Sequence, residues 1–102
     1  MNEKSKALPK TVEQAVDILF SELSLKEKTA IANMQKNSLN DLHFSLGRFI
    51  RNKFSVVDNE ELMKSCRLLS GKQDLHPDDA SSVIIESLWK NLQDTYALRM
   101  VE

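Results

Sequence analysis

The chain has 102 residues, 41% of them hydrophobic and 28% charged, which is the composition of a globular protein with room for one hydrophobic core. Its net charge of −1 disfavours nucleic-acid binding, and its two glycines and two prolines disfavour an all-β fold, which needs many tight turns. Cys66 is the only cysteine and no apolar run approaches the roughly 20 residues of a membrane span, so we expect a cytoplasmic protein without an intrachain disulfide.

The N-terminal part of the sequence predicts a leader and two helices. Residues 1–8 are polar and are expected to be a flexible leader, with a single all-helical domain over 9–102. The segment 11–14 reads as a capping box in which Thr11 and Gln14 exchange hydrogen bonds. The first helix carries an apolar stripe at steps of three and four residues, made of Val12, Ala15, Val16, Leu19, Phe20 and Leu23. A second capping box at 24–27 begins a short helix.

The middle of the sequence predicts two further helices. The segment 38–41 resembles a third helix cap, and we expect its helix to continue to about Phe54. The segment 54–57 favours an extended crossover that packs on the core. The segment 58–61 begins a fourth helix, which Gly71 ends. The apolar side of that helix is formed by Leu62, Cys66 and Leu69.

The last helix is expected to be the longest. Pro77 suits its first turn, and the acidic side chains that follow suit the positive end of the helix dipole. Its apolar stripe consists of Ile84, Ile85, Leu88, Trp89, Leu92 and Tyr96. Five helices with short connections predict a compact all-α bundle.

The segment His43–Asn52 mixes apolar and polar side chains in a pattern that one amphipathic helix does not require. Gly47 costs about 1 kcal/mol in a helix interior relative to alanine, so it indicates a crossing point with a neighbouring helix. In one interpretation this is the core helix, and Phe44 packs under a neighbour. In the other, Phe44, Arg48, Arg51 and Asn52 form an exposed face that binds a carboxylate, a phosphate or an acidic loop of a partner. The sequence leaves the two interpretations open.

A second unusual segment places His76 shortly before the carboxylates of Asp78 and Asp79. Imidazole and carboxylate groups bind Zn, Mn or Fe, and His43 is the one other histidine of the chain. The aspartates also suit the first turn of a helix and no established metal motif is present, so we expect no metal. We instead expect Arg51 to pair with one of the aspartates as a clasp between the middle and last helices.

The sequence contains no recognisable catalytic constellation. Cys66 lies on the apolar stripe of its helix, where a buried thiol is unreactive. No nucleophile elbow and no glycine-rich phosphate loop is present. We therefore expect a non-enzymatic protein without a cofactor.

Three blocks of the sequence resemble a family of small bacterial all-helical domains of unknown function. They cover residues 8–19, the segment 43–52 that reads HFSLGRFIRN, and the segment 76–85 that reads HPDDASSVII. The resemblance spans about residues 8–92. Where that family has a Trp-Gly-Leu-Trp-like segment, this chain has Phe-Ser-Val-Val at 54–57 and lacks the tryptophans. The resemblance implies a bacterial origin and a shared fold but no activity, and it links His43, Arg51, Asn52, His76, Asp78 and Asp79.

The functional expectation is a protein–protein interaction module that binds a partner protein or a second copy of itself. Its predicted binding residues are Phe44, Arg48, Asn52, His43 and His76. The alternative is a small-ligand or metal-binding domain that uses the two histidine-containing blocks.

Overall fold

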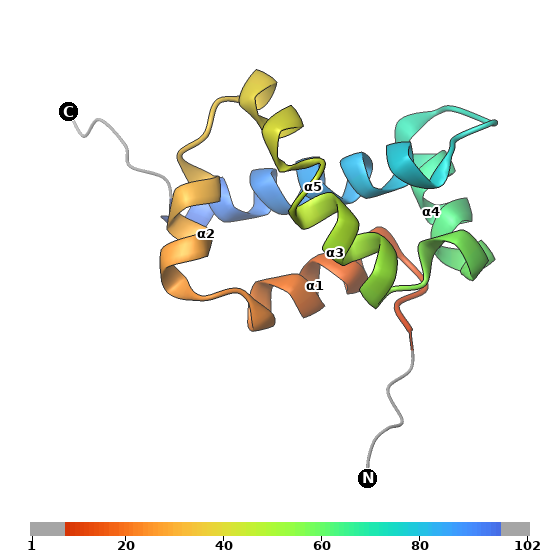
Figure 1. Ribbon diagram of the computed structural model, residues 1–102, viewed down its shortest axis with the longest axis horizontal. Coiled ribbons are helices and arrows are strands. Elements are labelled where there is room, and N and C mark those ends of the chain that lie inside the picture. The colour runs from red at the N-terminus through yellow and green to blue at the C-terminus, as the bar shows by residue number, and fades with distance from the viewer. Residues whose placement is uncertain (1–7, 97–102) are drawn as a thin grey trace, which may run out of the picture.

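Helices make up most of residues 8–96, the part of the chain that the computed structural model describes (Figure 1). Residues 1–7 and 97–102 lie outside this range, and with them nearly all of the predicted leader and the C-terminal end of the predicted domain. The described part contains five α-helices, two 3-10 helices and no strand, which confirms the predicted all-α bundle. The elements in chain order are α1 (Val12–Glu22), α2 (Leu25–Ala32), η1 (Lys36–Leu42), α3 (Leu46–Lys53), η2 (Val56–Asp58), α4 (Glu60–Ser70) and α5 (Pro77–Tyr96).

The first two helices begin at the predicted caps. Thr11 Oγ1 accepts the backbone N–H of Gln14 at 3.1 Å, but the Gln14 side chain accepts from the N–H of Lys10 rather than from Thr11. The box between Ser24 and Glu27 forms in both directions, at 2.9 and 3.0 Å. These bonds satisfy backbone N–H groups that have no partner within the first helical turn.

The predicted third helix over 38–54 is wrong in its first half. The chain forms the 3-10 helix η1, a turn at residues 43–45, and only then α3. Ser38 therefore lies inside η1 and caps nothing. Leu39 is buried and Leu42 is partly buried, and their spacing of three residues equals one turn of a 3-10 helix. The same spacing fits an α-helix, so the sequence pattern does not distinguish the two.

The predicted extended crossover at 54–57 is also wrong. A turn and the 3-10 helix η2 occupy this stretch, and Ser55 adopts a left-handed backbone with φ of 48° that reverses the chain. The expectation that the segment packs on the core is correct, because Phe54 and Val56 are both buried.

The buried side chain of Asn59 connects three parts of the chain. Its Oδ1 accepts the N–H of Leu62 at 3.2 Å and so caps α4. Its Nδ2 donates to the carbonyl of Pro9 at 2.9 Å and to that of Phe54 at 3.2 Å. This one amide group therefore holds the entry to α1 and the end of α3 beside the start of α4.

The end of α4 and the start of α5 follow the sequence prediction. Gly71 ends α4 with φ of 78°, a left-handed conformation that glycine adopts without a steric penalty. Pro77 is the first residue of α5, and Asp78 and Asp79 stand in its first turn.

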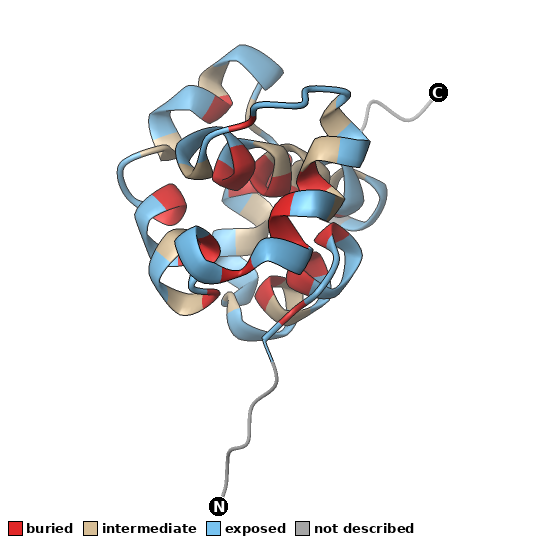
Figure 2. Ribbon diagram, turned by 90° about the vertical axis from the view of Figure 1, so that its right-hand side faces the viewer, coloured by how far each residue is buried: buried red, intermediate tan, exposed pale blue. Residues whose placement is uncertain are grey.

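Helix α5 is the element on which all the others pack. In Figure 1 it runs behind α2 and α3, passes above α1 and reaches α4 at its N-terminal end. Ile84, Leu88 and Leu92 are fully buried along it, and buried residues gather on the inward sides of the helices (Figure 2). Within residues 8–96, no helix combines the length and the apolarity needed to span a membrane.

Side chains of α5 also complete the C-terminal end of α2. Trp89 Nε1 donates to the carbonyl of Met34 at 2.9 Å, and Gln93 Nε2 donates to the carbonyl of Ala32 at 3.2 Å. Carbonyls at the end of a helix have no partner within it, so these contacts fix α2 against α5.

Candidate functional site

The predicted binding residues around α3 are exposed. Phe44 lies in the turn before α3 and is 81% exposed, so the interpretation that it packs under a neighbour is wrong. Arg48 and Asn52 are exposed one turn apart on α3. His43 is partly buried and its ring stands edge-on to that of Phe44, with the centroids 5.4 Å apart.

The opposite side of α3 packs on the core, which leaves these side chains facing solvent. Leu46, Gly47 and Ile50 are buried against the core. Phe49 lies at the edge of this buried side and is 44% exposed. We call the outward side chains the α3 face, which consists of Phe44, Arg48, Phe49 and Asn52.

The two cationic side chains on and beside this face differ in whether they have a partner. Lys53 Nζ forms an ion pair with Glu22 at 2.9 Å and lies 5.8 Å from the ring centroid of Phe49. Arg48 has no ion-pair or hydrogen-bond partner for its side chain among the described residues. A guanidinium in this position is available to a carboxylate or a phosphate from outside.

An apolar groove adjoins the α3 face. This α2–α3 groove has a volume of about 570 Å³ and includes Phe49 in its wall. Its other lining residues come from α1, α2, η1, α3 and the connections between them and are Leu19, Glu22, Leu23, Glu27, Ala30, Ile31, Met34, Leu42, Ser45 and Leu46. The groove is not evident from the sequence, because four separate segments meet to form it.

The two unusual sequence segments meet at Arg51. Arg51 Nε lies 3.4 Å from Asp78 Oδ1, and its Nη1 donates to Ser81 Oγ at 3.0 Å. Ser81 in turn donates to the carbonyl of Asp78 at 2.8 Å. Asp79 is exposed and takes no part in these contacts. The expected contact between α3 and α5 therefore forms through Asp78 alone.

Gly47 lies at the crossing of α3 with α5. A Cβ at this position would lie 3.5 Å from Ser81 Oγ and 3.2 Å from Arg51 Nη1. A larger side chain would push into the contact between the two helices, so the glycine permits the clasp residues to meet.

The histidines do not form a common site among the described residues. His76 is exposed, and no ring contact or hydrogen bond joins it to His43. Within residues 8–96, no group of three His, Cys, Asp or Glu side chains is placed to hold a metal ion.

Cys66 has the properties of a core thiol. It is buried, and its Sγ lies 3.7 Å from the carbonyl of Ala80. Burial raises the pKa of the thiol to about 11, and the charge of Arg67 opposes this rise only weakly. The reactive thiolate is therefore scarce at neutral pH.

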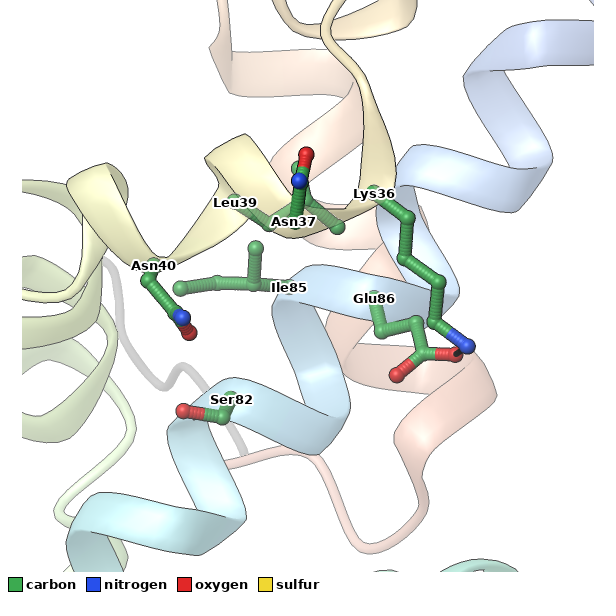
Figure 3. A pocket seen from close by; sticks show the side chains of 7 residues that line it. All are labelled: Lys36, Asn37, Leu39, Asn40, Ser82, Ile85 and Glu86. Carbon is green, nitrogen blue, oxygen red and sulfur yellow. Dashed lines mark ion pairs between the residues drawn. The ribbon is translucent and has the colours of Figure 1, made fainter.

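A polar cleft between η1 and α5 was not anticipated. Its volume is about 510 Å³ and it is lined by Lys36, Asn37, Leu39, Asn40, Ser82, Ile85 and Glu86. In Figure 3, Leu39 and Ile85 meet between the two helices, and the amide of Asn40 extends toward α5 near Ser82. Lys36 pairs with Glu86 at 3.4 Å at one end. The cleft offers amide and hydroxyl groups to a small polar molecule, but no motif in the sequence marks it.

These features define a small all-α domain with an exposed aromatic and basic surface on α3. The chain belongs to the family described as Domain of unknown function (DUF6794), whose model matches residues 8–92. The expected membership of an uncharacterised family is thereby confirmed. Comparison with curated proteins and comparison with solved structures give no match.

Proposed function

We propose that the protein is a non-catalytic protein–protein interaction module whose α3 face binds an acidic amphipathic segment of a partner protein. The observation that carries this proposal is the 81% exposure of Phe44 together with the guanidinium of Arg48, which has no partner in the described part of the chain. Burying a phenylalanine contributes about 1.5–3 kcal/mol, and Phe44 gains little of this within the fold. An aromatic ring beside an arginine is the composition typical of interface hot spots.

The α2–α3 groove supports the same proposal. Phe49 belongs both to the α3 face and to the groove wall, so the two form a continuous surface. An amphipathic partner helix would insert apolar side chains into the groove and place a carboxylate against Arg48. We therefore expect the partner segment to be apolar on one side and acidic along the adjoining edge.

Affinity purification with matched variants tests the proposal. Phe44→Ala and Arg48→Glu are expected to lose a partner that the wild-type protein retains. Val57→Ala is the control, because Val57 is also exposed and apolar but lies on η2. Binding of the purified partner to each variant is then measured by fluorescence anisotropy, with far-UV circular dichroism to verify the fold. A partner bound equally by all variants would contradict the proposal.

The finer expectations from the sequence stay predictions. They include a bacterial origin, a cytoplasmic location and self-association, of which the last is measured by analytical ultracentrifugation. The small-ligand alternative is less favoured, because Arg51 is already engaged by Asp78 and Ser81. The small-ligand alternative would be favoured if Zn or Mn shifted the thermal stability of the protein and if His43→Ala or His76→Ala abolished this shift.

A further inference from the structure

Helix α4 exposes two adjacent leucines. Leu68 and Leu69 are 78% and 60% exposed, although the sequence predicted Leu69 on the buried stripe of this helix with Leu62 and Cys66. The stripe turns outward in the last turn of α4, so these side chains contribute nothing to the core. Exposed apolar side chains that cluster in this way indicate a surface that another molecule covers.

The leucines border a second groove, which we call the acidic groove. It has a volume of about 770 Å³ and lies between α1, α4 and α5. Its lining residues are Thr11, Val12, Glu13, Val16, Asp17, Ser65, Leu68, Leu69, Ser87 and Asn91. Val12 and Val16 are buried and form an apolar floor beside the leucines.

The ionisable residues that line this groove are both acidic. Glu13 and Asp17 stand on α1, one turn apart, and neither has a partner for its carboxylate among the described residues. Glu61 lies on α4 one turn before Ser65, and its carboxylate is likewise unpaired within the described range. A hydrogen bond between two of the lining residues crosses the groove, in which Ser65 Oγ accepts the N–H of Val12 at 3.0 Å.

We propose that the acidic groove binds a cationic amphipathic helix of a partner protein. The partner's apolar side chains at positions i, i+3, i+4 and i+7 contact Leu68, Leu69 and the apolar floor. Its lysines or arginines along one edge pair with Glu13 and Asp17, which have no competing cation among the groove's lining residues. This charge is opposite to that of Arg48 on the α3 face, so the two surfaces select different partner segments. The inference does not depend on the function proposed for the α3 face.

Two synthetic peptides of about four helical turns test the proposal. Both carry leucines at the i, i+3, i+4 and i+7 positions, and their remaining positions are lysine in one and glutamate in the other. Fluorescence anisotropy is expected to show binding of the lysine peptide that weakens with added salt, and at least about tenfold weaker binding of the glutamate peptide. The paired variant Glu13→Lys and Asp17→Lys is expected to reverse this preference.

Surface variants distinguish the contribution of the two leucines from nonspecific hydrophobic binding. The double variant Leu68→Ser and Leu69→Ser is expected to bind the lysine peptide at least about tenfold more weakly than the wild-type protein does. The matched control Val57→Ser removes an exposed apolar side chain elsewhere, and Phe44→Ala alters only the α3 face. Both controls are expected to bind the lysine peptide as the wild-type protein does, and circular dichroism verifies each fold.

Three results would overturn the proposal. The first is equal affinity for the two peptides, and the second is binding of the lysine peptide that survives the leucine variant. The third is a dimer in sedimentation that the leucine variant dissociates, because the groove would then bind a second copy of this chain. Reversed preference in the Glu13→Lys and Asp17→Lys variant together with loss in the leucine variant would establish it.

Discussion

Removal of the Asn59 side chain is expected to destabilise the fold strongly, because this one amide group makes three hydrogen bonds. In Asn59→Ala, α4 loses the cap on the N–H of Leu62, which contributes about 1 kcal/mol. The carbonyls of Pro9 and Phe54 lose their donor, and a buried acceptor without one costs about 1–3 kcal/mol. Since both carbonyls share one amide group and relax together, we expect a total loss of about 2–4 kcal/mol.

Urea unfolding followed by circular dichroism measures this loss. We expect a lower midpoint with an unchanged m-value, and a Tm lower by roughly 10–30 °C for a domain of this size. Asn52→Ala is the matched control, because the Asn52 side chain is exposed and has no partner among the described residues. The control is expected to stay within about 0.5 kcal/mol of the wild-type protein. If the two variants unfolded at the same midpoint, the connecting role of Asn59 would be refuted.

Three further residues give predictions of different size. Gly47→Ala should change stability by less than about 1 kcal/mol, because the atom nearest to the added Cβ is the movable end of Arg51. Gly47→Leu should lower stability by about 1–3 kcal/mol. Equal unfolding midpoints for the two variants would contradict this prediction. Arg51→Ala should lower stability by only about 1 kcal/mol, because the Asp78 side chain is 66% exposed and water screens the ion pair. A loss above about 3 kcal/mol would indicate a buried ion pair and would contradict this prediction. Cys66 should react with a thiol reagent only after unfolding in urea, and rapid labelling of the native protein would argue against burial. The unfolded thiol ionises near pH 9 and the folded one near pH 11. The free energy of unfolding should therefore decrease as the pH rises from 9 to 11, and it should decrease less in Cys66→Ala.

Local signals in the sequence predicted the helix ends well. The Ser24 and Glu27 capping box and the stop at Gly71 depend on neighbouring residues, so a single segment carries the whole signal. The break before α3 was missed because Leu39 and Leu42 fit either type of helix. A signal of this kind gives the side of the chain that is buried but not the number of residues per turn.

Some features of the candidate sites were likewise predictable from the sequence, and others were not. The exposure of Arg48 follows from helical spacing, and the contact of Arg51 with α5 was predicted from the opposite charges of Arg51 and the aspartates. The exposure of Phe44 depends on the turn that interrupts the helix, and the α2–α3 groove and the acidic groove depend on how separate helices meet. The connecting role of Asn59 was not predicted, because its bond to Pro9 joins residues 50 positions apart. Such long-range contacts leave no local pattern to detect.

The position of α5 in the chain has a consequence for how the domain forms during synthesis. The four α-helices before it are only 8 to 11 residues long, and helices shorter than about 12–15 residues are marginal alone in water. Each of them packs on α5, which is the last of the five to be made. We therefore expect the nascent chain to stay without a stable core until Pro77 and the residues after it have left the ribosome. The domain then acquires its helices and its tertiary structure in one cooperative step.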